Sequence, residues 1–404
     1  MAGNGLPKQV RRRMYSFARL VSRPFSDSRR SHFLEDMISG LIIGGHVHLS
    51  KVARAVYAGD TNIHGAEKKL SRHLGSEHWD MSPAEDFLLQ RSAAMVGEET
   101  LIVADLTDLS KPWAKKMEGL GRVHDGSDPQ QGIKPGYMVL EAYVRVGKWQ
   151  LFPLKLELLK TYSGGPTSEN AEILQYVRTM HEATGGKGIW VWDRGADRNE
   201  LMLPWLRQQV AFVIRQRGDR HVRLADDTLV EMKTLAEQHK PPTPSASRPW
   251  PKRGQTRTLP VRLPDDAEHP LLLVMHWRRA TSEPFLLLVS PQARRSGRRA
   301  EWFLKAYRRR WGVEDATRGI KQVFDLELFL VRTWRALRRL LTLVAIAFFW
   351  LNLWAEPKFD HLREALLNHP WRLPKEVIYV FSWIATLIHQ LLHPRPTGAF
   401  RTDP

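Results

Sequence analysis

The chain has 404 residues, enough for two or three domains and at least one sizeable hydrophobic core. It contains no cysteine, which excludes disulfides and thiolate-ligated zinc and fits a reducing compartment such as the cytoplasm. A net charge of +18 predicts a polyanionic partner, with nucleic acid as the leading candidate, and 43% hydrophobic residues favour a packed enzyme over a ribosome-like protein.

Residues 1–95 are predicted to form a basic arm and a helical DNA-binding domain. The first 26 residues contain no acid, which is typical of a DNA-facing arm or a transit peptide, and the basic remainder of the chain favours the arm. Two amphipathic segments, "SKVARAVYAG" and "AEKKLSRHLG", flank the turn "DTNIHG". This pattern predicts either a DNA-reading helix–turn–helix or a small bundle that only packs.

Residues 96–217 predict a mixed α/β core. The apolar run "TLIVAD" ends in Asp105, and "GYMVLEAYVRVG" and "KWQLFPLKLELL" form a predicted hairpin that turns at Gly147 and Lys148. A helix over 168–183 follows, then the strand "GIWVWD" ending in Asp193, a helix from about Arg198, and the strand-like run "QVAFVIRQRG". Three hairpin-type strands followed by alternating helix and strand are typical of an α/β fold.

The remaining third of the chain predicts a β-rich insertion and two helical parts. Residues 218–297 contain a proline-rich loop and the strand-like runs "PLLLVMHW" and "PFLLLVS". Residues 298–355 are expected to complete the core, and residues 356–404 to form a C-terminal helical region. The apolar stretches 340–354 and 377–392 are too short for membrane spans and are expected to be buried helices.

Two aspartates, Asp105 and Asp193, each lie where an apolar strand is predicted to end. The carboxyl ends of strands in α/β sheets face the crevice where ligands bind, although either residue taken singly is equally well a turn or cap residue. Asp108 and Asp197 fit better as turn and helix-start residues. The pair His46 and His48 has no thiol or carboxylate trio near it and does not predict a zinc site.

The stretch "YRRRWGVEDATRGIK", residues 307–321, predicts one helix with a charged face. At about 100° per residue, Tyr307, Arg310, Glu314 and Lys321 lie within about a 60° arc, with Arg318 inside that arc or at its edge. Three hard oxygen ligands, Asp105, Asp193 and Glu314, suit two Mg²⁺ (or Mn²⁺) ions and phosphodiester cleavage. On this face Arg310, Arg318 and Lys321 would hold phosphates, whereas Arg308 and Arg309 point elsewhere.

The order and spacing of Tyr307, Arg310, Glu314 and Lys321 resemble the Y-R-E-K signature of DDE transposases of bacterial insertion sequences, the cut-and-paste branch. "VADLTDLSKP" and "VWDRGADR" resemble the two aspartate motifs of that family, and the resemblance covers roughly residues 35–350. It implies a ribonuclease-H-like mixed sheet core with a β-rich insertion, preceded by a helical DNA-binding domain and followed by C-terminal helices. The implied catalytic and metal-binding residues are Asp105, Asp193 and Glu314, and the implied DNA-binding residues are Tyr307, Arg310, Arg318 and Lys321.

The resemblance also implies partners and a reaction. The partners are double-stranded DNA, as terminal inverted repeats and target DNA, and a second subunit in a DNA-bound homodimer, without a membrane. Excision in this branch commonly passes through a DNA hairpin, and an aromatic side chain of the insertion stacks on a flipped base; Trp277 is either that residue or a core tryptophan. The implied location is the nucleoid of a bacterial cytoplasm.

The predicted function is therefore a transposase that hydrolyses DNA 3′ ends and then uses the freed 3′-hydroxyl to attack target DNA. Two rival functions remain open at this point. One is a transposase-derived repressor that binds DNA without cutting it, and the other is a non-transposing metal-dependent nuclease. The intact set of three acids disfavours the repressor, and the Y-R-E-K spacing disfavours the nuclease.

Overall fold

The computed structural model describes residues 5–57, 62–124, 132–147, 150–242, 244, 250–294, 297–354 and 380–392. It divides into two compact units, which are described separately. The first comprises Met1–Ser92, Leu106–Pro166 and Glu314–Pro404, and the second comprises Ala93–Asp105 and Thr167–Val313. Lys148, most of the predicted proline-rich loop, and residues 356–379 and 393–404 of the predicted C-terminal region lie outside the described residues.

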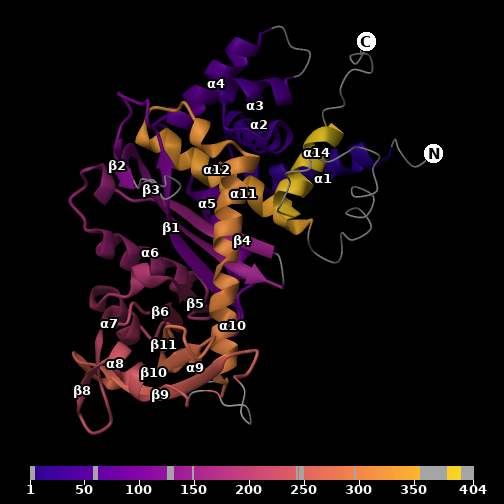
Figure 1. Cartoon of the computed structure of the whole chain (residues 1–404). Helices are drawn as coiled ribbons and strands as arrows, with labels where there is room; N and C mark the ends of the chain where they lie inside the picture. The colour runs from indigo at the N-terminus through magenta and orange to yellow at the C-terminus, as the bar shows by residue number, and fades with distance from the viewer. Residues whose placement is uncertain are drawn as a thin grey trace, which may run out of the picture. The chain divides into compact units, whose positions relative to one another are not determined.

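The N-terminal helices of the first unit pack around α2 (Ser28–Gly44). Its apolar residues recur at helical spacing, and Phe33, Leu34 and Met37 are fully buried. The helix begins after Asp27, whose side chain accepts a hydrogen bond from the Arg29 amide, and ends at Gly45 in the left-handed conformation. Around it lie α1 (Gly5–Ser22), α3 (Leu49–Val56) and α4 (Ile63–Gly75), with α5 (Ser82–Ala93) following (Figure 1). The two predicted helices are confirmed, but α4 begins at Ile63, within the predicted turn "DTNIHG".

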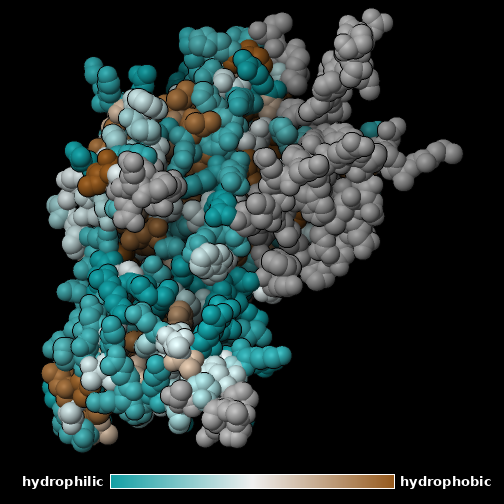
Figure 2. Space-filling model, in the orientation of Figure 1, coloured by the Kyte–Doolittle hydropathy of each residue, from teal (hydrophilic) through white to brown (hydrophobic). Residues whose placement is uncertain are grey.

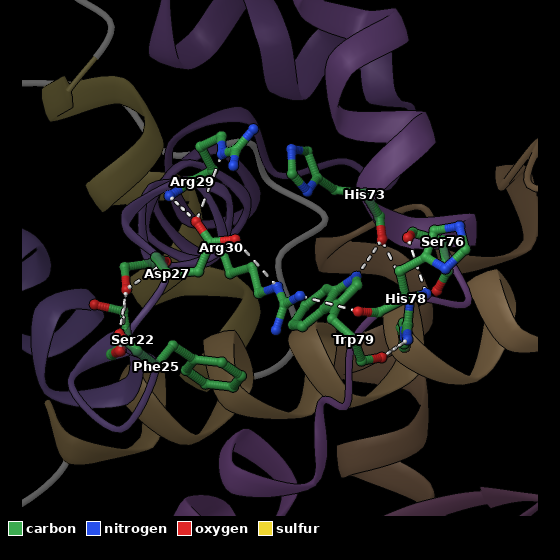
Figure 3. Close-up of polar contacts among 11 residues, drawn as sticks. Ser22, Phe25, Asp27, Arg29, Arg30, His73, Ser76, His78 and Trp79 are labelled. Carbon is green, nitrogen blue, oxygen red and sulfur yellow. Dashed lines mark hydrogen bonds and ion pairs between the residues drawn. The ribbon is translucent and has the colours of Figure 1, made fainter.

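Side-chain donors bind backbone carbonyls in the last turn of α4 and in the segment that follows it. The indole nitrogen of Trp79 donates to the His73 carbonyl at 2.9 Å, and Arg30 donates to the His78 carbonyl at the same distance (Figure 3). Helix ends leave carbonyls without helical partners, so these donors satisfy groups that would otherwise need water. They also connect α2 to the segment that follows α4.

The sheet of the first unit consists of antiparallel hairpins covered by a long helix. β3 (Ile133–Val146) pairs antiparallel with β2 (Gly121–His124) and β4 (Gln150–Leu158), and the predicted turn contains Gly147 at φ 63°. α12 (Trp334–Leu353) packs on β4, where buried Asn352 accepts a hydrogen bond from the Leu151 amide at 2.9 Å. Of the described helices, α12 alone has the length and apolarity to cross a membrane. However, 89% of its apolar 18-residue stretch is buried inside the protein, as predicted for a core helix.

The second unit contains the parallel part of the sheet. The beginning of β1 (Leu101–Ser110) pairs parallel with β5 (Ile189–Trp192), which pairs parallel with β6 (Phe212–Arg215). The connections are α6 (Glu169–Ala183), capped by Ser168, and α7 (Asn199–Arg207). The predicted alternation of helix and strand is confirmed.

An antiparallel set of strands extends this sheet beyond β6. β11 (Phe285–Val289) pairs with β6 and with β10 (Asp266–Trp277), and β10 pairs with β9 (Gln255–Leu263). β7 (His221–Arg223), β8 (Leu229–Glu231), α8 (Met232–Gln238) and α9 (Pro291–Arg294) complete this part, and α10 (Ala300–Arg310) packs against β5, β6, β9 and β11. The predicted mixed α/β sheet, with a β-rich insertion and helices before and after it, is confirmed.

Candidate active site

Asp105 lies inside β1 and not at its end. The predicted strand end is therefore wrong: β1 continues five residues further, to Ser110, and Asp108, predicted as a turn residue, also lies within the strand. The apolar run stops at Ala104, but the strand continues because β1 neighbours β3 in the sheet. Backbone pairing sets the strand end here, and side-chain hydrophobicity does not.

Arg310 forms an ion pair with Asp105. The distance from its Nη1 to Oδ2 of Asp105 is 3.0 Å, and its side chain is 8% exposed at the C-terminal end of α10. Burial alone lowers the pKa of this guanidinium, but the nearby Asp105, Tyr307 and Asp193 together raise the pKa above its usual value. The structure thus assembles these four residues, all predicted from sequence, in the second unit.

Tyr307 forms part of the wall beside this ion pair. The side chain is buried, and its ring packs edge-on against Phe285 of β11 with 5.1 Å between ring centroids. The Arg310 guanidinium lies 5.8 Å from the centre of the same ring. Tyr307 therefore contacts the insertion strand and the arginine at once, and its ring limits where the guanidinium can move.

Asp193 directly follows β5, as predicted. Its side chain accepts a hydrogen bond from the Gly195 amide at 2.7 Å and so begins the short 3₁₀ helix Arg194–Ala196. One carboxylate oxygen is thereby oriented by the backbone. The cap interpretation is therefore correct in geometry, and it is compatible with a ligand role because a carboxylate has several acceptor positions.

Asp197 is a structural residue whose partners the sequence did not reveal. Its side chain is 2% exposed, accepts from the Arg217 amide at 2.8 Å and pairs with Arg220 Nε at 2.7 Å. It precedes α7 as expected, yet its main contacts are with the segment after β6. Two charge-assisted hydrogen bonds at a buried carboxylate stabilise this corner of the second unit.

Glu314 lies in the first turn of α11 (Gly312–Val323), at the start of the last segment of the first unit. The prediction of one helix through residues 307–321 is wrong, because α10 ends at Arg310 and α11 begins at Gly312. Trp311 between them has φ −49° and ψ −22°, close to 3₁₀ values, and Gly312 disfavours a helix interior. The calculated 60° face therefore spans two helices, with Tyr307 and Arg310 on α10 and Glu314, Arg318 and Lys321 on α11.

Lys321 and Arg318, predicted to hold phosphates, lie in different surroundings on α11. Lys321 Nζ is 3.0 Å from Glu327 and 3.6 Å from Asp108, so two carboxylates already neutralise it. Arg318 is exposed. Burial raises the pKa of the neighbouring Asp315, and the positive charge of Arg318 offsets part of this rise. Of these two cations, Arg318 is the more exposed.

A buried carboxylate on β3 contacts α11 beside Glu314. Glu141 is 3% exposed and accepts a 2.8 Å hydrogen bond from the Tyr143 hydroxyl and another from the Thr317 hydroxyl. Thr317 lies one helical turn after Glu314. The sequence signal was weak, because Glu141 interrupts an otherwise apolar strand and no local pattern indicates its partner.

The donor set of the second unit suits a hard divalent cation. Asp105 and Asp193 supply carboxylate oxygens, the ligands that Mg²⁺ and Mn²⁺ prefer. Arg310 already contacts one oxygen of Asp105, so an ion would be bound through the remaining acceptor positions. Within the described part of the chain, no three or more His, Asp or Glu side chains form a ready metal-binding cluster.

Two other sequence candidates have local structural roles. His46 places Nε2 3.2 Å from Asp325, while its Nδ1 accepts a hydrogen bond from the His48 amide, so both ring nitrogens are engaged. Burial lowers the pKa of His46. Trp277 is 1% exposed at the end of β10, in agreement with its interpretation as a core tryptophan.

Comparisons with known proteins agree with part of the sequence resemblance. The family model described as "Transposase DDE domain" matches residues 158–350, a range that includes Asp193 and Glu314. Among solved structures, a cryo-EM structure of a piggyBac transposase synaptic complex with hairpin DNA is similar over 95% of this chain and 77% of that chain. The sequence identity is 10% and the TM-score is 0.47. No curated protein matches the sequence.

Proposed function

We propose that the protein is a DNA transposase that cuts the ends of a DNA element and joins them to target DNA by metal-assisted phosphoryl transfer. The observation that carries this proposal is the match of the transposase DDE domain model to residues 158–350. That range contains Asp193, Arg310 and Glu314. The ion pair that connects Arg310 to Asp105 adds the remaining predicted acid to the group.

The three acids have distinct roles in the proposed reaction. Asp105 and Asp193 hold the cation from neighbouring parallel strands, and Glu314 adds a third carboxylate from α11. Two Mg²⁺ or Mn²⁺ ions, when bound, supply charge that stabilises the attacking and leaving oxygens of an in-line displacement. Water is the nucleophile for end cleavage, and the freed 3′-hydroxyl is the nucleophile for strand transfer.

Arg310 orients Asp105 in this proposal. A guanidinium presents its donors in a rigid fork, so it fixes the plane of the carboxylate that it contacts. Its charge also lies beside the position where a scissile phosphate would bind. Tyr307 restricts the guanidinium from the other side, and Arg318 is the accessible cation of α11 for a flanking phosphate.

The remaining parts of the chain fit the same proposal. The helices within residues 1–95 would recognise the terminal inverted repeats, and residues 96–217 and 298–355 would form the catalytic core interrupted by the insertion at 218–297. The helical region at 356–404 would follow this core. The active form would be a DNA-bound homodimer in the bacterial nucleoid.

Cleavage of DNA that carries the inverted repeats flanking the gene tests the proposal. Asp105→Asn, Asp193→Asn and Glu314→Gln should each bind this DNA normally but cleave it at least about 100-fold more slowly in Mg²⁺, because an amide holds a cation poorly. Asp315→Asn, next to Glu314, is the matched control and should cleave at the wild-type rate. Wild-type cleavage by all three variants would reject the assignment, and DNA binding without cleavage by the unmodified protein would indicate a repressor.

A further inference from the structure

Two loops of the first unit lie side by side, and we call them the paired loops: residues 111–118, which follow β1, and residues 326–332, which follow α11. Lys111 Nζ donates to the carbonyls of Glu327 at 2.7 Å and Phe329 at 2.5 Å. The Glu118 amide donates to the Arg332 carbonyl at 2.9 Å. These bonds join the two loops at both ends.

The inner side of the paired loops is packed. Phe329 is fully buried and Leu326 is 4% exposed, and the Lys111 ammonium lies 3.8 Å from the centre of the Phe329 ring. A cation over an aromatic ring is attracted by the negative charge of the ring face. These buried contacts therefore hold the backbone of the paired loops in place, and the exposed side chains project from that fixed backbone.

The outer side of the paired loops exposes large apolar side chains. Trp113 is 90% exposed, Leu330 65% and Leu328 54%, and Trp113 is the most exposed large apolar residue of the described chain. The face drawn in Figure 2 is predominantly hydrophilic, with separate apolar patches. A buried tryptophan removes 150–250 Å² from water, so Trp113 contributes little of that area to folding and is available for a partner.

The same outer side carries an excess of positive charge. Lys115, Lys116 and Arg332 are exposed, and they outnumber the two acids of the loops, exposed Glu118 and Glu327, whose side chain is 40% exposed. One oxygen of Glu118 accepts a hydrogen bond from the Trp334 amide at 3.0 Å. An aromatic side chain among cations matches the chemistry of duplex DNA, whose grooves offer base edges and thymine methyl groups beside the backbone phosphates. Protein interfaces, in contrast, are depleted in lysine.

We propose that the paired loops are a second DNA contact, which holds the duplex beside the cut. Lys115, Lys116 and Arg332 contact backbone phosphates, and Trp113 makes an apolar contact with a base. The inference rests on the proposed function. Its geometry is local to the first unit: α11 spans about 13 Å from Glu314 to Val323, so a duplex lying along it reaches the paired loops within a few phosphates.

The two kinds of contact predict different responses to salt. Trp113→Ala in the full-length protein should weaken binding of a fluorescein-labelled inverted-repeat duplex about tenfold, with an unchanged slope of log K against log salt. Lys115→Ala combined with Lys116→Ala should reduce the magnitude of that slope by about 2, because each phosphate contact contributes about one released counterion. Leu229→Ala and Lys187→Ala, at exposed positions of the second unit, are the matched controls and should change neither quantity.

Fluorescence anisotropy without divalent metal, at four or more salt concentrations, measures both quantities, and sedimentation velocity measures self-association. Wild-type affinity in Trp113→Ala, or an unchanged slope in the lysine variant, overturns the inference. A Trp113→Ala effect on self-association alone also overturns it, because the surface then serves a second copy of the chain. If Asp105→Asn abolishes cleavage but all loop variants bind DNA normally, only this inference is rejected. If the loop variants change binding as predicted but the unmodified protein does not cleave DNA, only the catalytic proposal is rejected.

Discussion

Arg310 and Asp105 lie 205 positions apart in the sequence and form an ion pair of 3.0 Å in the second unit. Arg309, the residue before Arg310, is exposed, so two identical side chains at adjacent positions have opposite environments. This difference agrees with the predicted contrast between the two arginines, although the helix is interrupted directly after them. Arg310 is therefore expected to act first as the partner of Asp105.

Arg310→Ala should lower the free energy of unfolding by about 1 to 3 kcal/mol, because it leaves the partly buried Asp105 carboxylate, 25% exposed, without its cation. Arg309→Ala should cost less than about 1 kcal/mol, as expected for an exposed charge. Urea denaturation measures both. A double-mutant cycle with Asp105→Asn should show a coupling free energy above about 1 kcal/mol, and a coupling near zero would contradict the ion pair.

The pKa of Lys111 is lowered to about 8 by burial, with Glu327 opposing part of the shift. Between about pH 8 and 10.5 the unfolded chain binds this proton and the folded chain does not, so the free energy of unfolding should rise with pH across that window. Lys111→Met should flatten this rise, whereas Lys115→Met, at an exposed neighbour, should retain it. Thermal unfolding at a series of pH values provides the measurement, and identical profiles for both variants would disprove the assignment.

Thr317→Val should destabilise the protein by about 1 to 3 kcal/mol, because it removes a hydroxyl donor from the buried Glu141 carboxylate while keeping the shape of the side chain. Thr317→Ser keeps the hydroxyl and should lose less than half as much. Because Thr317 lies one turn after Glu314, Thr317→Val should also slow cleavage more than it weakens DNA binding. Chemical denaturation and single-turnover kinetics distinguish Thr317→Val from Thr317→Ser. Equal stability of the two variants would count against the hydrogen bond from Thr317 to Glu141.

Arg339 of α12 caps the C-terminal end of α4 and is expected to be a major stabilising residue of the first unit. Its guanidinium is buried, its pKa is lowered to about 10 by burial, and it donates to four backbone carbonyls, those of His73, Leu74, Ser76 and Trp79.

Arg339→Met should therefore cost about 3 to 5 kcal/mol, since several buried carbonyls lose their donors. Arg335→Met is the matched control on the same helix: its side chain is 43% exposed and pairs with exposed Glu77, so the loss should be below about 1 kcal/mol. Calorimetric unfolding of both variants gives the comparison. Similar transition temperatures would show that water replaces the guanidinium.

Binding of the unmodified protein to nonspecific duplex DNA should weaken steeply with salt. With a net charge of +18, we expect a slope of log K against log salt steeper than about −4, since several lysines and arginines release counterions. Titrations at increasing salt measure this slope. A nearly salt-independent affinity would remove the reason for interpreting the basic charge as a DNA surface.

Local patterns in the sequence were sufficient to predict most elements and the position of Asp193. The apolar runs of β5 and β6 and the amphipathic spacing of α6 depend on residues near in sequence, so they can be recognised without tertiary information. The break between α10 and α11 also had a local signal, because Gly312 disfavours a helix interior, but regular charge spacing concealed it. The candidate acids and the cations of this stretch were likewise predicted from residue type and order.

Tertiary structure alone decided which of these residues act together. The end of β1 at Ser110 depends on pairing with β3, and the Arg310–Asp105, Thr317–Glu141 and Lys111–Phe329 contacts join positions far apart in the chain. Sequence periodicity does not identify such partners. The environment of a side chain depends on which distant element packs against it in the folded protein. The sequence therefore determined the elements and the candidate chemistry, whereas burial and long-range pairing decided that Arg310 supports Asp105 and that Trp113 remains exposed.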